Sequence, residues 1–230
     1  MRIQKYFSER NILSRRETED FILKGFITVN GKVVKELGTQ IDPEKDVVEI
    51  IADAKPTLGK KITIAFNKPR GYVSSKIKEE GPTIFDLLPQ FTYLNTVGRL
   101  DKESEGLILL SNDGVVTALI TSENHLIEKE YEVTVHESVP EGKLRKMAAG
   151  VRLSDGMTLP ARTKQISPHT FRIILKEGRK HQIRRMCDAL HLTIQRLVRL
   201  RIGPITLKDI SSGGFRPLTE EEIKKIKSTQ

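Results

Sequence analysis

Apolar and polar positions in the first fifty residues predict a helix followed by short strands. Ser14 and Glu17 have the three-residue spacing of a capping box, which predicts a helix that begins after Ser14 and runs to about Lys24. Two apolar runs within residues 27–34 flank an Asn-Gly pair, whose residues readily adopt the positive φ angles of a two-residue hairpin turn. Residues 47–51 add another strand, so this part of the chain is expected to form a compact unit.

A stretch without apolar periodicity separates this unit from the rest of the chain. Residues 53–61 contain Pro56 and Gly59, and such a composition is typical of a linker between domains. We therefore expect two domains, one of residues 1–58 and a larger one of residues 59–230.

After the linker, helical and strand patterns alternate without the regular period of a parallel, doubly wound fold. The expected fold class is α+β: a small N-terminal α/β unit, then a larger domain with a mixed, mostly antiparallel sheet and flanking helices. The predicted strands are residues 62–66, 107–110, 131–135, 171–175, 193–200 and 205–207, and the predicted helices are residues 115–121, 140–147, 179–190 and a C-terminal helix capped by Thr219 and Glu222.

Charge narrows the possible partners. The chain carries 39 Lys and Arg against 30 Asp and Glu, a net charge of +9 that favours a polyanion such as nucleic acid, or an anionic surface. Basic and acidic residues nearly balance in residues 1–60, so most of the excess lies later in the chain. It is concentrated in residues 176–201, which predicts a surface that faces phosphates.

Other features of the composition exclude several kinds of site. The single cysteine, Cys187, excludes an intramolecular disulfide and a cysteine-rich zinc site, and its position on the apolar face of a predicted helix indicates a core residue. The histidines do not have the spacing of a metal site. No apolar signal core and no run as long as a membrane span occurs, so we expect a soluble, cytoplasmic protein. No phosphate-binding loop or dinucleotide-binding motif occurs either, so we expect no cofactor.

The candidate chemistry lies in residues 98–114, GRLDKESEGLILLSNDG. This segment places one carboxylate, Asp101, on a tight turn between Arg99 and an apolar strand. A rigid strand anchors the turn, which suits a reacting group. From spacing alone, the three acids Asp101, Glu103 and Glu105 could equally form a solvated surface loop.

The same segment resembles the catalytic motif of pseudouridine synthases, in the branch that modifies ribosomal RNA and carries a small N-terminal RNA-binding domain. That branch reads Gly-Arg-Leu-Asp, two variable residues, Thr-Glu-Gly-Leu, aliphatic residues, then Thr-Asn-Asp-Gly. Here Ser104 and Ser111 replace the two threonines, and each keeps the hydroxyl. The resemblance covers nearly the whole chain and implies that Asp101 is the catalytic carboxylate.

Three further positions match the pattern of this family. In KEYEVTV, Tyr131 matches the aromatic residue that the family places against the target base. In EGRKHQIRRM, Arg184 matches the arginine that pairs with the catalytic aspartate, while Arg185 points about a quarter turn away on a helix. In QRLVRLRIG, Leu197 matches the aliphatic residue that closes over the base, although Leu200 or Ile202 could fill a similar role.

The resemblance and the basic clusters together suggest residues that contact RNA. The N-terminal unit resembles a small RNA-binding domain first known from a small-subunit ribosomal protein. The turn at residues 67–71 resembles a Lys-Pro-x-Gly turn that the family has beside its active site, and its charged side chains are expected to face outward. The candidate contacts are Arg2, Lys5, Arg15 and Arg16 in the first unit, and Lys68, Arg99, Arg179, Lys180 and Arg185 in the second.

The implied reaction isomerises uridine and needs no metal, redox cofactor or energy donor. Asp101 either attacks the anomeric carbon or takes a proton from the neighbouring ribose carbon, and either route requires the uridine to flip out of its stack. The segment HQIRRMCDALHL favours large-subunit ribosomal RNA, naked or in an assembling particle, as the partner of a monomeric enzyme. Small-subunit ribosomal RNA and transfer RNA remain open.

Two other functions are compatible with parts of this sequence. A glycoside hydrolase would use Asp101 and Glu105 as paired carboxylates, but a chain without Trp offers no aromatic-rich platform for sugars. An RNA-binding ribosome-assembly factor without catalysis fits the charge equally well. The joint presence of Asp101, Tyr131 and Arg184 favours the enzyme.

Overall fold

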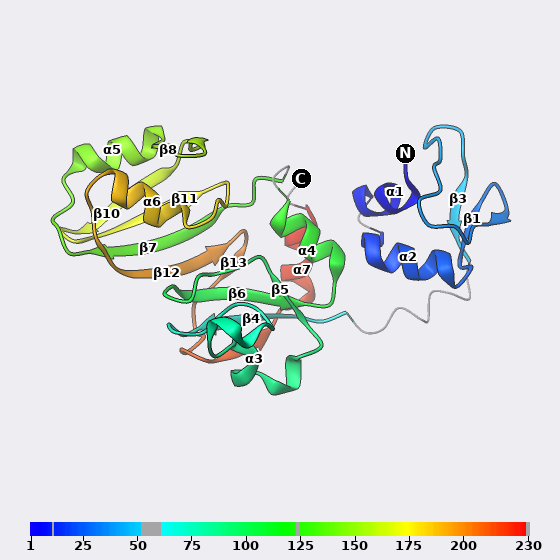
Figure 1. The fold of residues 1–230 in the computed structure, drawn as a ribbon, viewed down its shortest axis with the longest axis horizontal. Helices are drawn as coiled ribbons and strands as arrows, with labels where there is room; N and C mark the ends of the chain where they lie inside the picture. Colours follow the sequence, from blue (N-terminus) through cyan, green and yellow to red (C-terminus); the bar gives the residue numbers. More distant parts are fainter. Residues whose placement is uncertain (11, 52–60, 123–124, 229–230) are drawn as a thin grey trace.

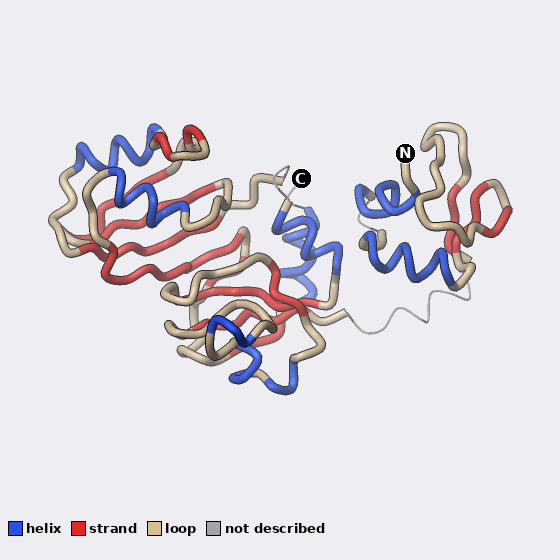
Figure 2. Tube along the Cα trace, in the orientation of Figure 1, coloured by secondary structure: helices blue, strands red, loops and turns tan. Residues whose placement is uncertain are grey.

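The computed structural model describes residues 1–10, 12–51, 61–122 and 125–228. Its chain folds into a small N-terminal unit and a larger unit built on one long sheet (Figures 1 and 2). The predicted boundary between residues 58 and 59, and most of the predicted linker, fall outside the described residues.

The N-terminal unit packs two helices against a small antiparallel sheet, as the sequence predicts. The capping box is present, because the Ser14 hydroxyl accepts from the Glu17 backbone N–H while the Glu17 carboxylate accepts from that of Ser14. Its core is apolar and includes Phe7, Ile22 and Ile27. The sheet order is β2-β1-β3, and the elements are α1 (Ile3–Glu9), α2 (Arg15–Leu23), β1 (Ile27–Val29), β2 (Lys32–Val33) and β3 (Val48–Ile50).

The larger unit is built on a mixed sheet with the strand order β10-β11-β7-β12-β6-β4-β14, in which β13 also pairs with β12 and β5 with β6. The strands are β4 (Thr63–Lys68), β5 (Asn95–Val97), β6 (Glu105–Ser111), β7 (Lys129–Val135), β10 (Arg162–Ser167), β11 (Thr170–Leu175), β12 (Ile194–Ile202), β13 (Ile205–Thr206) and β14 (Phe215–Pro217), with β8 (Arg152–Leu153) and β9 (Gly156–Met157) in a separate hairpin.

Helices cover the sheet in two groups. In Figures 1 and 2, α5 and α6 lie over the half formed by β10, β11 and β7, whereas α4 and α7 lie beside β6. The half with β10, β11 and β7 has one apolar core, and the half with β6 and β4 has a core on each of its two faces. The helices are α3 (Ile84–Leu87), α4 (Gly114–Thr121), α5 (Glu141–Ala149), α6 (Gln182–Ala189) and α7 (Glu220–Ser228), with short 3-10 turns η2 (Lys78–Glu80) and η3 (Pro89–Phe91).

The two halves meet where β6 and β12 run parallel, whereas the other paired strands are antiparallel. Only two residue pairs form this junction, Val198 with Glu105 and Arg199 with Gly106. Gly106 has a φ of +101°, and a Cβ there would lie 2.4 Å from the Arg199 carbonyl oxygen. The close approach of the strands therefore requires glycine. We call this junction the seam.

Most predicted elements of the larger unit are confirmed, including the C-terminal capping box of Thr219 and Glu222. The helix predicted from residue 179 is an exception, because α6 begins only at Gln182. His181 precedes it with a left-handed φ of +51°, which no helical residue adopts. Cys187 is buried in the core as expected, and burial raises the pKa of its thiol to about 12.

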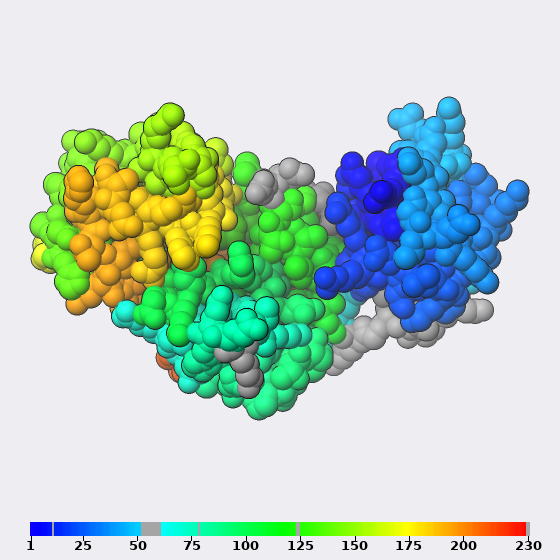
Figure 3. Space-filling view, viewed as in Figure 1, coloured from blue at the N-terminus to red at the C-terminus, as the bar shows by residue number. Residues whose placement is uncertain are grey.

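The N-terminal unit lies at one end of the molecule, beside α4 (Figure 3). Lys61 pairs with Glu17 at 3.1 Å and with Asp113, the N-cap of α4, at 3.4 Å. A Cβ on Gly114 would lie 2.2 Å from that of Ser14, so the two helix N-termini approach closely. One lysine thus links the capping residues of α2 and α4.

Candidate functional site

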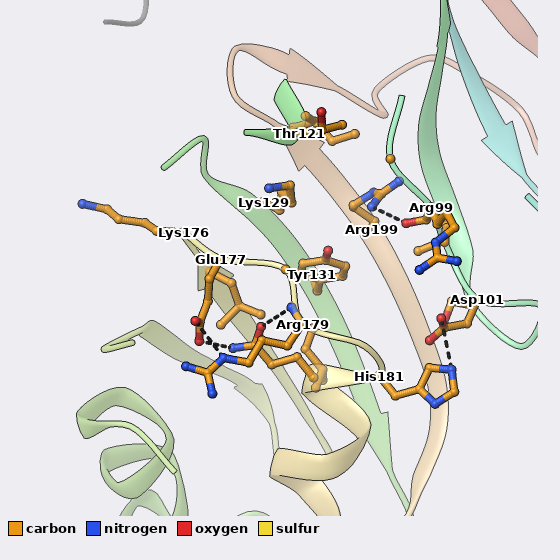
Figure 4. A pocket seen from close by; sticks show the side chains of 18 of the residues that line it. Arg99, Asp101, Thr121, Lys129, Tyr131, Lys176, Glu177, Arg179, His181 and Arg199 are labelled. Atoms are coloured by element: carbon orange, nitrogen blue, oxygen red, sulfur yellow. Dashed lines mark hydrogen bonds and ion pairs between the residues drawn. The ribbon is translucent and has the colours of Figure 1, made fainter. Parts of the chain in front are cut away.

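A pocket of about 520 Å³ opens at the seam. Its walls come from the loop between β5 and β6, from the strands β7 and β12, and from the segment that joins β11 to α6. Figure 4 shows that Asp101, Tyr131 and Arg199 converge on it from three separate parts of the chain. The volume lies within the range of sites that hold small molecules or single residues of a polymer.

Asp101 lies in this pocket between two nitrogen-bearing side chains. Its Oδ2 is 3.7 Å from Nε of Arg184, and its Oδ1 is 3.5 Å from Nε2 of His181. The carboxylate side chain remains 36% exposed, so a ligand in the pocket can reach it. The structure therefore brings together the aspartate and the arginine that the sequence motif predicts, and adds a histidine.

Arg184 also supports the loop that carries Asp101. Its Nη2 donates to the Glu103 carbonyl at 3.0 Å and to the buried Ser104 hydroxyl at 3.1 Å. Arg185 points elsewhere, as predicted, and donates to Asp155 at 2.9 Å. The two neighbouring arginines therefore serve different carboxylates.

The expectation that Lys68 faces outward is wrong, because its side chain is 0% exposed. Its ammonium group donates to the carbonyls of Pro69 (2.9 Å), Lys102 (3.3 Å) and Ser104 (2.7 Å). Burial lowers the pKa of Lys68 to about 8, and the nearby Asp101 carboxylate opposes this shift. Lys68 thus lies beneath the loop that carries Asp101, where three carbonyls take up all three of its donors.

Tyr131 and Leu197 lie on neighbouring strands and line the pocket as expected. A bulge in β12 between Arg199 and Arg201 shifts the register by one residue. As a result, Ile202 faces the same side as Leu197 and lines the pocket, and Leu200 is not among the lining residues. Of the two alternatives to Leu197, the structure therefore favours Ile202.

The other predicted RNA contacts fall into two groups. Arg99 and Lys180 are exposed, as are the four basic residues of the N-terminal unit, Arg2, Lys5, Arg15 and Arg16. Arg179 is instead held within the protein by Glu177 at 3.0 Å and the Met157 carbonyl at 2.6 Å, and Arg185 is held by Asp155. These last two side chains already have protein partners, which weakens them as RNA contacts.

Glu105 does not accompany Asp101 in the pocket as the glycoside hydrolase alternative requires. Glu105 is not among the residues that line the pocket, and its carboxylate pairs with Arg196 at 2.9 Å. The pairing of Asp101 with Glu105 is therefore not supported. Within the described ranges, we find neither a cluster of three metal-ligating side chains nor a helix with the length and apolar character needed to span a membrane.

Sequence analysis missed three residues of this site. His181 received no function, although it lies three residues before Arg184 in the same motif. Arg199 and Lys129 both line the pocket, and Arg199 donates to the Leu107 carbonyl at 2.6 Å and to the Arg99 carbonyl at 3.3 Å. Alternation along β7 and β12 with Tyr131 and Leu197 could have placed both on the same face.

Comparisons with known proteins agree with this geometry. Residues 62–189 match the RNA pseudouridylate synthase family, and residues 1–48 match the S4 domain. The chain is 37% identical to the dual-specificity RNA pseudouridine synthase RluF of Escherichia coli, over 97% of this chain and 77% of that protein. It is 35% identical to an uncharacterized RNA pseudouridine synthase of Mycobacterium leprae, over 98% of this chain and 92% of that protein.

A solved structure gives the same result. The chain resembles the crystal structure of a pseudouridylate synthase with a TM-score of 0.72 and 31% sequence identity, covering 98% of this chain and 99% of that one. The likeness therefore extends over both units of the molecule.

Proposed function

Because this chain belongs to the RNA pseudouridylate synthase family, we propose that it converts a uridine of ribosomal RNA to pseudouridine with Asp101 as the reacting carboxylate. The observation that carries the proposal is the position of Asp101, which is partly exposed in the pocket and held between Arg184 and His181. We assign RNA binding to residues 1–58 and catalysis to residues 59–230.

The reaction detaches uracil from the ribose, turns it over and rejoins it through a carbon atom. Asp101 starts this sequence in one of two ways: by attack on the anomeric carbon, or by removal of a proton from the neighbouring ribose carbon. Both routes need an ionised carboxylate with one oxygen accessible to the sugar. The guanidinium of Arg184, with Nε 3.7 Å from Oδ2, helps to orient this carboxylate.

The pocket also has to hold the detached base. Tyr131 presents an aromatic ring and a hydroxyl, and Leu197 and Ile202 supply apolar contacts from the neighbouring strand. A base held against these side chains cannot diffuse away before it rejoins the sugar. Since the pocket is closed on one side by the sheet, the uridine has to leave its stack to enter.

For the class of RNA that is modified, we propose large-subunit ribosomal RNA. The S4 domain supports an RNA partner, and the segment HQIRRMCDALHL, which contains α6, resembles the branch of the family that acts on large-subunit RNA. The name of the Escherichia coli relative records dual specificity, which keeps a second class of RNA within the proposal. Small-subunit and transfer RNA are therefore included as substrates in the test.

The test is to incubate the purified chain with unmodified ribosomal and transfer RNAs and to map pseudouridines by chemical labelling and primer extension. Asp101→Asn is the matched control, because it removes the charge and keeps the size of the side chain. New sites in large-subunit RNA that are absent from the control support the proposal. Sites only in another RNA refute the target assignment, and binding without any new site indicates the RNA-binding factor without catalysis.

A further inference from the structure

Two cations stand at the end of the pocket beyond Tyr131. Lys129 lies on β7, two residues before Tyr131, and Arg199 lies on the adjacent strand β12, where it pairs with Tyr131. In Figure 4 both side chains lie on the pocket side of the sheet, on the opposite side of Tyr131 from His181. Neither cation takes part in the chemistry proposed for Asp101.

Arg199 has an unused hydrogen-bond donor. The residue is only 4% exposed, and its Nε and Nη1 donate to the backbone carbonyls of Leu107 and Arg99. Its Nη2 is buried and has no hydrogen-bond partner in the part of the chain that the structure describes. A buried guanidinium N–H without a partner is unfavourable and rare, so an acceptor from outside the chain is expected here.

Lys129 adds a second positive charge beside it. Its ammonium group donates to the Ile127 carbonyl at 3.3 Å. Burial lowers the pKa of Lys129, and the charge of Arg199 lowers it further. The neighbouring acids Glu128 and Glu130 both pair with Arg201 at 3.1 Å, so among the described residues no ion pair with a carboxylate offsets the two pocket cations.

We propose that Lys129 and Arg199 form an anion subsite, which binds a phosphodiester of the RNA strand next to the target uridine. Two desolvated cations need a partner with net negative charge, and each phosphodiester carries one, whereas the carbonyl oxygens of uracil carry none. The cavity continues past the cations to Gly98 and Thr121, so the strand has room beyond the flipped nucleotide.

The subsite is also connected to the loop that carries Asp101. Arg199 donates to the Arg99 carbonyl, two residues before Asp101. A phosphate bound to Nη2 is therefore positioned relative to the backbone that carries the reacting carboxylate. The inference rests on the proposed RNA substrate, and it assigns the two cations the task of fixing the register of the strand.

The test uses the trinucleotide ApUpA, in which one phosphodiester at a time is replaced by a neutral methylphosphonate. Binding to the full chain is followed by NMR through the methyl resonances of Leu197 and Ile202, which report on the pocket. We expect one of the two replacements to weaken binding about tenfold in the wild type, and to have a smaller effect in Lys129→Met, where Arg199 alone remains at the subsite. Lys164→Met, which removes an exposed charge from β10, should keep the wild-type response.

Each other outcome contradicts the inference in a distinguishable way. Equal binding of both neutral analogues and native ApUpA by the wild type overturns the phosphate subsite, and this comparison stands even if Lys129→Met does not fold. If Lys129→Met responds to the neutral position as strongly as the wild type does, Lys129 has no part in the subsite and the proposal is overturned. Weaker binding by Lys129→Met with no phosphate dependence assigns the cations to the uracil ring instead. Failure of ApUpA to perturb the pocket contradicts the proposed substrate as well.

Discussion

The loop that carries Asp101, residues 99–105, and the basic rim, residues 176–185, both contribute residues to the pocket and are held in different ways. Under the loop, the buried Lys68 donates to three backbone carbonyls, and the buried Ser74 hydroxyl donates to the Leu100 carbonyl at 2.6 Å. In the rim, Arg179 is held by side chains and carbonyls that water also reaches.

This difference separates the residues that position Asp101 from those expected to bind RNA. Removal of a buried donor leaves carbonyls without partners, and each such group is costly, whereas exposed ion pairs contribute little. The geometry around Asp101 therefore depends on a few buried residues. We expect RNA affinity, in contrast, to be spread over many exposed basic side chains, none of which dominates.

The largest effect is expected from Lys68→Met, which removes the donor beneath the loop. The carbonyls of Pro69, Lys102 and Ser104 lose their partner, so the loop shifts and Asp101 moves away from Arg184. We expect turnover to fall about 100-fold and the free energy of unfolding by about 2–4 kcal/mol. Single-turnover rates and urea unfolding measure these two losses, with Lys164→Met as the control. Wild-type turnover and wild-type stability in Lys68→Met would show that the loop keeps its conformation without this lysine.

The lowered pKa of Lys68 also predicts how the free energy of unfolding depends on pH. Its pKa is lowered to about 8 in the folded state, whereas an unfolded lysine has a pKa of about 10.4. Between these two pH values Lys68 keeps its proton in the unfolded state but loses it in the folded state. The free energy of unfolding therefore rises with pH in this range, by up to about 3 kcal/mol from this group. Below about pH 8 the contribution of Lys68 does not change with pH. Urea unfolding of the wild type and Lys68→Met across this range tests the sign, and a constant difference between them contradicts it.

A smaller effect is expected at His181, whose Nε2 lies 3.5 Å from Asp101 Oδ1. We expect His181→Ala to lower turnover about tenfold, because the carboxylate loses one of the two groups that orient it. His181→Gln keeps a donor in this place and should recover most of the rate, without a change in RNA affinity. If alanine and glutamine variants behave alike, the histidine does not act through a hydrogen bond.

The smallest effects compare two neighbours in the rim, Arg179 and Lys180. Arg179→Met should lower Tm by about 2–4 °C with little change in RNA affinity, because the side chain is bonded within the protein. Lys180→Met should leave Tm unchanged and reduce the salt dependence of RNA binding by about one phosphate contact. The reverse pattern would mean that Arg179 leaves its protein partners when RNA binds.

Features fixed by local sequence were the most predictable. The capping boxes at Ser14 and Thr219 and the hairpin at Asn30 depend on residues close in the chain, and all are confirmed. The start of α6 was misplaced because His181 adopts a left-handed conformation, which is uncommon for a residue with a side chain. The adjacent strands of the seam could not be inferred from either segment alone.

Roles that depend on distant partners were not predictable. The local sequence of Lys68 predicts an exposed charged residue in a turn. Its buried position depends on distant groups such as the carbonyl of Ser104, 36 residues later, which accepts a hydrogen bond from its ammonium group. In the sequence, Arg199 cannot be distinguished from the other cations of its basic segment. Only the pairing of β12 with β6 places its guanidinium where it donates to the Leu107 carbonyl. By contrast, Asp101, Tyr131 and Arg184 were identified because their motifs resemble those of a known family.

The most direct test of the separation between positioning and binding is to measure RNA affinity and single-turnover pseudouridine formation for Asp101→Asn on the same RNA. The exchange removes one charge in the pocket and leaves the exposed basic side chains in place. We predict that turnover falls below detection while the Kd stays within about threefold of the wild type. Retained turnover, or a loss of affinity as large as the loss of rate, would contradict the account.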